Sequence, residues 1–203
     1  MNTRDPVLVP VAISDLRPTQ MTVGRREVEA KRQAWRERAQ RDGREFLGRH
    51  MIPVLLGPKA RRYVIDHHHL ACALLAEGVV HVAVNTVADL SALSRTEFWV
   101  FCDNRGWCHP FDAEGKRRPY DDIPKTLGDL ADDPFRSLAG ELRRAGGFAK
   151  QLTPFEEFTW ADFLRRRIAP RLVRDDFDAA MAEALKLAHS SAASHLPGWC
   201  GAG

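Results

Sequence analysis

The residues "YVIDHHHLACALLAEGV" at 63–79 constrain the fold more than any other stretch of the chain. A run of β-forming residues ends in Asp66, three histidines follow at once, and an almost wholly apolar helix begins. Gly78 is well placed to end that helix. The first N–H groups of a helix are unpaired and its dipole is positive there, so this strand-to-helix turn favours an anion.

The polar residues of this turn admit three interpretations. Asp66 fits a helix N-cap, and the histidines fit hydrogen-bond donors to phosphate or acid and base groups near neutral pH. Asp and His are also ligands for zinc or manganese, but His67, His68 and His69 point around a helix and do not converge easily on one ion. In the third interpretation Asp66 only caps a core helix and the histidines hydrogen-bond locally. The residues alone leave all three open.

Strand and helix patterns alternate over roughly the first 90 residues. Strands are predicted at 7–13, 52–56, 63–65 and 79–87, and helices at 23–48 and 69–78. Beyond them the chain passes through a loop rich in Gly, Pro and Asp and becomes mainly helical. We therefore expect an α+β fold, with an α+β domain at 1–95, a loop-rich joint at 96–125 and a helical C-terminal region at 126–203.

The composition is that of an ordinary globular protein. Hydrophobic residues make up 44% of the chain, and the formal net charge is only +3 at pH 7, so charge alone does not indicate nucleic acid. The four cysteines form no tight pattern, which favours a reducing compartment. No stretch resembles a signal core or is long enough to span a bilayer, so we expect a soluble cytoplasmic protein.

The predicted helix at 23–48 carries many basic side chains with acidic ones between them. One interpretation is a face for phosphate groups, in which Arg25 and Lys31 bind the anion. The interspersed Glu27 and Glu29 favour instead a solvated helix stabilised by ion pairs about one turn apart.

Cysteines and aromatic residues gather in the loop after this domain. Cys102, Cys108 and His109 lack the second cysteine pair that a zinc site of this type needs. Trp99 and Trp107 suit stacking on a base, although packing in a core is the commoner use of such residues.

Several runs of the sequence resemble a known family. The segment "ISDLRPTQ" at 13–20, the basic helix and the turn at 63–79 resemble the ParB/sulfiredoxin-like fold. More closely, the runs "DHHHLACALL", "DDPFRSLAG", "GGFAK", "PFEEFTWADFLR" and "HLPGW" resemble the ParB-like putative nuclease family over nearly the whole chain. This resemblance implies a ParB/sulfiredoxin-like N-terminal domain that binds nucleotide or phosphate groups at the polar turn, with a mainly helical C-terminal part.

Carried over by position, the resemblance implies roles for single residues. It implies catalytic roles for Asp66, His68 and His69, with His68 as the acid or base and Asp66 also holding a divalent ion. The expected cofactor-binding residues are His67, Thr19 and Gln20, together with Arg25 and Lys31 of the basic helix. The implied cofactor is Mg²⁺ or Mn²⁺ with ATP, ADP or CTP, and the implied partner is a nucleotide, a nucleic-acid phosphate or a small-molecule phosphate acceptor.

Three positions depart from the patterns of relatives in this superfamily, which include free-serine kinases. His67 stands in place of glycine, Leu70 in place of a phosphate-pairing arginine, and Gln20 in place of a catalytic glutamate. Three functions therefore stay open: a metal-dependent nuclease or phosphohydrolase, an ATP- or ADP-dependent small-molecule kinase, and a non-catalytic nucleotide- or DNA-binding module. Whether the chain is an enzyme stays open with them.

Overall fold

The structure, a computed structural model, describes residues 10–42 and 51–202. The chain divides into two compact units, each assembled from separate segments. The sheet unit comprises Met1–Met21, Val28–Pro110 and Pro119–Leu130, and the helical unit comprises Thr22–Glu27, Phe111–Arg118 and Ala131–Gly203. The chain crosses between the units repeatedly, so the linear division expected at residues 95 and 125 describes the sequence and not these units.

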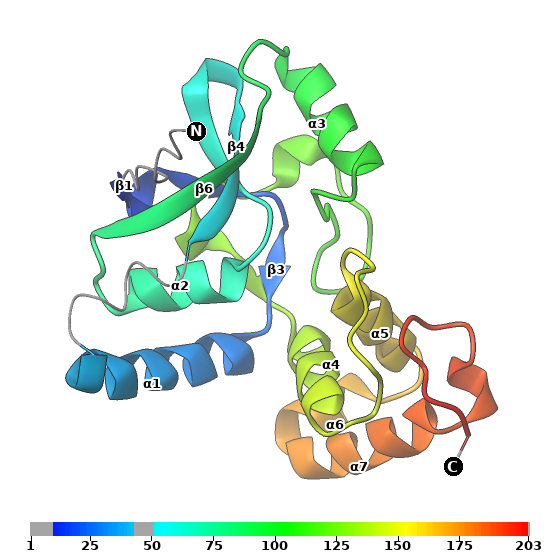
Figure 1. Cartoon of the computed structure of the whole chain (residues 1–203). Coiled ribbons are helices and arrows are strands. Elements are labelled where there is room, and N and C mark those ends of the chain that lie inside the picture. The colour runs from blue at the N-terminus through cyan, green and yellow to red at the C-terminus, as the bar shows by residue number, and fades with distance from the viewer. Residues whose placement is uncertain (1–9, 43–50, 203) are drawn as a thin grey trace, which may run out of the picture. The chain divides into compact units, whose positions relative to one another are not determined.

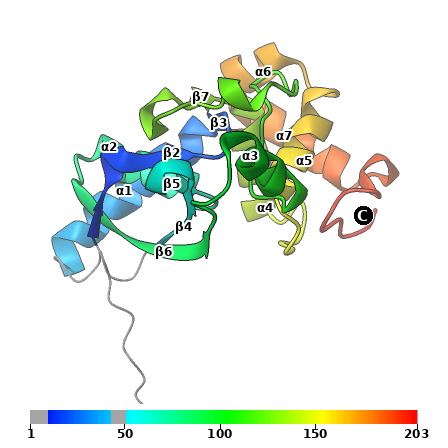
Figure 2. The same ribbon diagram turned by 90° about the horizontal axis from the view of Figure 1, so that it is seen from above.

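The sheet unit is built on a mixed five-stranded sheet in the order β1-β6-β4-β5-β2 (Figure 1). Its strands are β1 (Pro10–Ala12), β2 (Leu16–Pro18), β4 (Ile52–Gly57), β5 (Arg61–Val64) and β6 (His81–Asp89). β4 pairs antiparallel with β5 and parallel with β6, while β2 runs parallel to β5 at one edge (Figure 2). Ile52, Val54 and Val64 are fully buried, because β-branched side chains of central strands pack well inside a sheet.

Three helices belong wholly or largely to the sheet unit: α1 (Arg25–Asp42), α2 (His68–Ala76) and α3 (Arg95–Asn104). α2 ends where Gly78 takes a φ of +72°, a conformation that glycine adopts at little steric cost. Glu77 accepts hydrogen bonds from Arg32 Nε at 2.7 Å and Arg36 Nε at 2.8 Å. These bonds join α1 to the end of α2. They also lower the pKa of Glu77 to about 2, the bond with Arg36 having the larger effect.

An aromatic cluster forms part of the core of the sheet unit. The rings of Tyr63, Phe98 and Trp99 lie within 5.5 Å of one another, centroid to centroid, and all three are buried. They come close to β4 at Gly57, where an added Cβ would lie 2.7 Å from the Tyr63 ring and 2.8 Å from the Phe98 ring. A residue without a side chain is therefore needed at this point of the strand.

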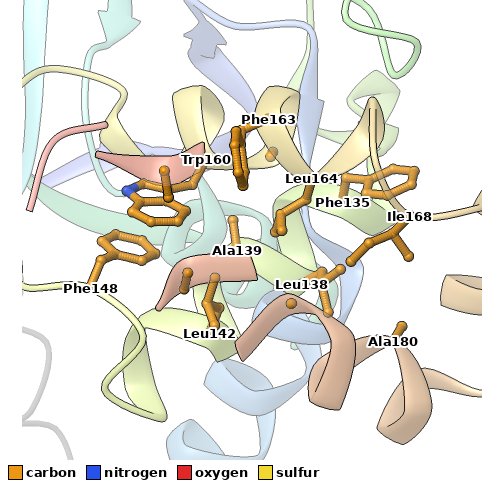
Figure 3. Close-up of a cluster of buried hydrophobic side chains, with 14 of the residues drawn as sticks. Phe135, Leu138, Ala139, Leu142, Phe148, Trp160, Phe163, Leu164, Ile168 and Ala180 are labelled. Carbon is orange, nitrogen blue, oxygen red and sulfur yellow. The ribbon is translucent and has the colours of Figure 1, made fainter. Parts of the chain in front are cut away.

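The helical unit contains the two-stranded pair β3–β7 and four α-helices. Their bounds are β3 (Thr22–Val23), β7 (Ala131–Asp132), α4 (Pro134–Arg144), α5 (Glu156–Arg165), α6 (Pro170–Asp175) and α7 (Phe177–Ala188). Their apolar faces meet in a buried cluster around Trp160 and Leu142 (Figure 3). The Trp160 ring stacks on Phe148 with centroids 4.4 Å apart, and its Nε1–H donates to the Pro197 carbonyl at 2.8 Å.

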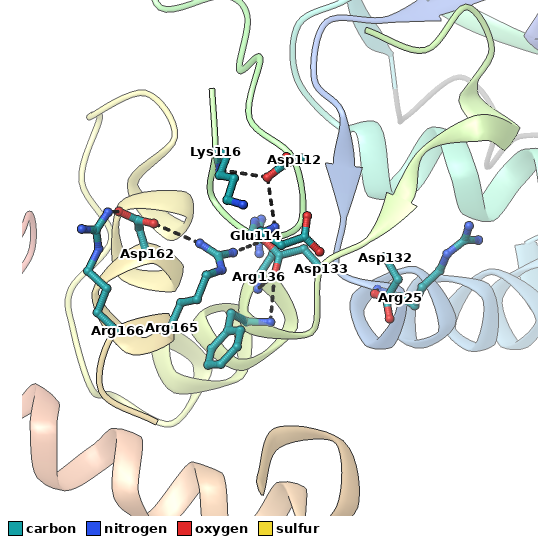
Figure 4. A network of polar contacts seen from close by, with 11 residues as sticks. Arg25, Asp112, Glu114, Lys116, Asp132, Asp133, Arg136, Asp162, Arg165 and Arg166 are labelled. Carbon is teal, nitrogen blue, oxygen red and sulfur yellow. Dashed lines mark hydrogen bonds and ion pairs between the residues drawn. The ribbon is translucent and has the colours of Figure 1, made fainter. Parts of the chain in front are cut away.

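A buried polar network fixes the start of α4 in the helical unit (Figure 4). One oxygen of Asp133 accepts from the N–H groups of Phe135 and Arg136, at 2.9 and 3.1 Å. Its other oxygen accepts from Arg165 at 2.6 Å. Asp133 is thus the N-cap of α4, and its second oxygen is bound by the Arg165 guanidinium. Both oxygens therefore serve to hold the structure together.

The expected mixture of strands and helices is confirmed, and the elements near the polar turn lie where they were predicted. The predicted helix at 23–48 matches α1 as far as Asp42, while residues 43–48, and residues 7–9 of the first predicted strand, lie outside the described residues. All four cysteines are free thiols. In the part of the chain that the structure describes, no helix is long and apolar enough to cross a membrane.

Candidate functional site

The turn between β5 and α2 places an exposed pair of polar side chains at the start of a buried helix. α2 begins at His68, and its N-cap is His67, not Asp66 as expected from the sequence. Asp66 Oδ1 instead accepts the N–H of His67 at 2.6 Å. The side chains of Asp66 and His67 are 76% and 48% exposed, and Asp66 Oδ2 lies 3.9 Å from His67 Nε2.

The backbone of His67 is left-handed, with φ 64° and ψ 25°. Non-glycine residues adopt this region at a cost and do so most often where function or tight packing requires it. The turn therefore keeps a backbone suited to glycine while presenting an imidazole.

His68 is buried beneath the turn and is engaged on both sides of its ring. Its Nε2 accepts the N–H of Thr19 at 3.2 Å, and a second hydrogen bond joins the ring to the Val64 backbone. Burial, followed by the nearby charge of His69, lowers the pKa of His68 to about 3. The ring is therefore neutral at physiological pH and ties the residue that follows β2 to the start of α2.

The remaining predicted residues of the sheet unit lie deeper. Thr19 is fully buried and donates its hydroxyl hydrogen to the Val64 carbonyl at 2.7 Å. Gln20 and His69 are buried as well, and Gln20 forms a β-bridge with His109. The structure thus gathers the polar turn and the end of the β2 segment into one cluster, in which only the Asp66 and His67 side chains are substantially exposed.

Arg25 and Lys31 both lie on α1 but in different units. The N–H of Arg25 donates to Asp132 Oδ1 at 2.9 Å within the helical unit. Lys31 is half-buried in the sheet unit. Arg25 therefore belongs to the other unit from the polar turn, whereas Lys31 belongs to the same unit as the turn.

The turn does not fit a resident metal centre. Among the described residues, no group of three or more His, Cys, Asp or Glu side chains is arranged to hold an ion. At the turn only Asp66 and His67 offer exposed donors, whereas zinc takes four ligands and magnesium or calcium six or more. A single carboxylate is nonetheless sufficient where the phosphates of a ligand supply most of the coordination.

Apart from the polar turn, the sheet unit contains a recess that the sequence does not reveal. It has a volume of about 320 Å³. Five of its lining residues are basic, Arg17, Lys59, Arg61, Arg95 and Lys125, and three are aromatic, Tyr63, Trp99 and Tyr120. These residues come from four separate segments, so no spacing in the sequence groups them. The residues alone suggest only stacking on Trp99 and the positive charge of Lys59 and Arg61.

Known proteins place the chain in one family. A family model described as "Putative ParB-like nuclease" matches residues 9–166. The crystal structure of protein Atu1540 from Agrobacterium tumefaciens is similar to this chain at 58% identity, with a TM-score of 0.89, and the match covers 97% of this chain and 99% of that one. No curated protein matches. Since the family model spans most of the 203 residues, the chain belongs to the family described as putative ParB-like nucleases.

Proposed function

We propose that this chain binds the phosphate group of a nucleotide or nucleic acid at the turn between β5 and α2, on a ParB/sulfiredoxin-like fold. The left-handed turn at His67 carries the proposal. It sets an exposed imidazole at the N-terminus of a buried helix, where the helix dipole favours an anion. Membership of a ParB-like nuclease family supports the same class of ligand.

Within this proposal the residues have different roles. His67, whose side chain is exposed, contacts the phosphate and serves as acid or base if a phosphodiester is hydrolysed. Asp66 is the carboxylate that would hold a divalent ion, Mg²⁺ or Mn²⁺, brought by the phosphates; such an ion supplies neutralising charge. His68 positions the turn from beneath, because its Nε2 already accepts the Thr19 N–H.

The buried residues also weigh against the kinase alternative. A phosphotransferase needs a group near the acceptor that can take its proton. Gln20 cannot act as a base, is buried, and is engaged in a bridge to His109. Binding, with or without hydrolysis of a phosphodiester, is therefore the function that we propose.

Thermal-shift titration with ATP, ADP, CTP and GTP, with and without Mg²⁺, tests the proposal. A ligand at ~100 times its Kd should stabilise the wild type by about 2.7 kcal/mol. We expect His67→Ala to lose most of this stabilisation and Asp66→Asn to lose its Mg²⁺-dependent part. His81→Ala, which removes an exposed histidine from β6 in the same unit, should keep it.

Two results would count against the proposal. A wild type that melts cooperatively and shows no shift with any of the four nucleotides would remove nucleotide binding. Equal losses in His67→Ala and His81→Ala would mean that the histidine at the turn has no special part in binding.

A further inference from the structure

The recess of the sheet unit is lined on β5 by Arg61 and Tyr63 and not by the residues of the polar turn. β5 begins at Arg61, which lines the recess, and ends at Val64, from which the chain leads into the turn. None of Asp66, His67 or His68 lines the recess. It is therefore a separate site, and nothing in the proposed function uses it.

Three aromatic rings form one wall of the recess. Trp99 packs edge-on against Tyr63, with centroids 5.5 Å apart, and stacks on Tyr120 at 6.0 Å with an angle of 12° between the planes. The Tyr120 hydroxyl donates to Asp103 Oδ2 at 2.6 Å, which fixes the orientation of the ring. Tyr63 and Trp99 are buried and Tyr120 is half-buried, so the exposed aromatic surface comes mainly from Tyr120, which rests on the two buried rings. Base–aromatic stacking uses such preformed surface.

Positive charge surrounds this wall. Arg17, Lys59, Arg61, Arg95 and Lys125 line the recess, and none of the described residues that line it carries a carboxylate. Arg95 pairs with Asp121 at 2.7 Å just outside the lining. Like charges converging on one recess repel one another, and an anion bound between them relieves that repulsion.

The β4–β5 connection holds one of these cations in an unusual backbone. Lys59 and Ala60 follow one another with φ values of 61° and 54°, both left-handed and neither glycine. A pair of left-handed residues is the geometry that tight hairpin turns favour, although glycine and asparagine are the commoner residues there. Here it places Lys59 at the lining of the recess.

We propose that this recess binds one nucleotide unit, with its base against the Tyr120 ring, which Trp99 supports from behind, and its phosphate among the basic residues at the β4–β5 connection. The volume of about 320 Å³ is at the lower end of the range of small-ligand sites and suits a single nucleotide. Aromatic surface beside converging cations recognises a base with its phosphate, rather than an inorganic anion or an apolar molecule. The same chemistry is offered by a free mononucleotide and by a nucleotide within a single strand.

Fluorescence anisotropy with a labelled oligothymidylate of about ten nucleotides tests this assignment. Unlabelled thymidine monophosphate is the competitor that distinguishes the free nucleotide from the strand. We expect the double variant Arg61→Glu/Lys125→Glu to weaken binding by about tenfold or more, since both changes reverse charges in the lining. Arg62→Glu is the control: it reverses one charge, against two in the double variant, one residue along β5, where successive side chains alternate between faces, and Arg62 does not line the recess.

A second pair of variants separates stacking from charge. Tyr120→Ala removes part of the aromatic wall and should weaken binding about tenfold, whereas Tyr120→Phe keeps the ring and should retain most of the affinity. Retained Tm values for the two charge variants show that their effects do not come from unfolding. These substitutions lie outside the polar turn, so their effect does not depend on whether the turn itself binds phosphate.

Each outcome has a defined meaning. If thymidine monophosphate competes with the strand, and the double variant weakens this competition, the site binds a free nucleotide. If only the strand binds, the site binds single-stranded nucleic acid. Both outcomes support the proposal. Equal losses in Arg62→Glu and in the double variant would show unspecific attraction and overturn it. So would the absence of binding by either ligand, or a loss confined to His67→Ala, which would place the nucleotide at the polar turn instead.

Discussion

At the scale of single residues, burial has turned His68 from a titratable group into a structural one. Its pKa of about 3 in the folded protein lies well below the ordinary value of 6.5. Between these two values the unfolded chain binds a proton that the folded protein does not. Stability contributed by the neutral ring is therefore complete above about pH 6.5 and is lost as the pH falls toward 3.

This difference predicts a specific pH dependence of folding. Between pH 7 and pH 4, His68 should reduce the free energy of unfolding by about 3 kcal/mol. His68→Gln removes the titrating group, while the amide can still accept and donate hydrogen bonds. Between pH 7 and pH 4 the variant should therefore lose about 3 kcal/mol less of its free energy of unfolding than the wild type. Urea unfolding at both pH values measures the difference. His81→Gln should behave as the wild type, and an unchanged pH dependence in His68→Gln would show that another group controls it.

At the scale of elements, a single glycine lets an aromatic helix pack on a strand. Gly57 has a φ of −105°, which any residue can adopt, so its importance is one of space. An added methyl group would lie within 2.8 Å of the Tyr63 and Phe98 rings. We expect Gly57→Ala to lower the free energy of unfolding by about 1–3 kcal/mol, because packed rings cannot move aside freely.

Gly128→Ala is the control for that substitution. A Cβ at Gly128 meets nothing nearer than 3.7 Å, in the same unit of the protein. Its effect on the free energy of unfolding should stay within about 0.5 kcal/mol. Denaturant unfolding of the two variants gives the comparison, and equal effects would refute the steric explanation for Gly57.

The elements also show what the sequence can and cannot predict. The hairpin and the apolar helix α2 are predictable, because the short apolar run of β4 with the turn residues after it, and the apolar run before Gly78, are local signals. The N-cap is wrongly predicted at Asp66, since a left-handed His67 has no clear signal in a chain without glycine at that place. The basic and aromatic recess is not predictable, because only tertiary packing brings Arg17, Arg61 and Tyr120 together.

At the scale of the whole molecule, the path of the chain joins the two units. The chain passes from one unit to the other after residues 21, 27, 110, 118 and 130. α1 is one continuous helix, although Arg25–Glu27 belong to the helical unit and the rest to the sheet unit. Because helix formation is cooperative, unfolding of either unit should disturb the other through this shared element.

We therefore expect a single cooperative melting transition that mutations in either core displace. Leu55→Ala in the sheet unit and Leu142→Ala in the helical unit each remove a fully buried side chain. Each should destabilise the protein by about 2–5 kcal/mol, which lowers the Tm by roughly 2–4 °C per kcal/mol for a chain of this length. Leu152→Ala, at a fully exposed position, should leave the Tm nearly unchanged.

Differential scanning calorimetry tests this expectation. One shared peak that shifts in both core variants supports coupling of the two units through the chain. Two peaks, of which each variant moves only one, would show that the units unfold independently despite their interleaved sequence.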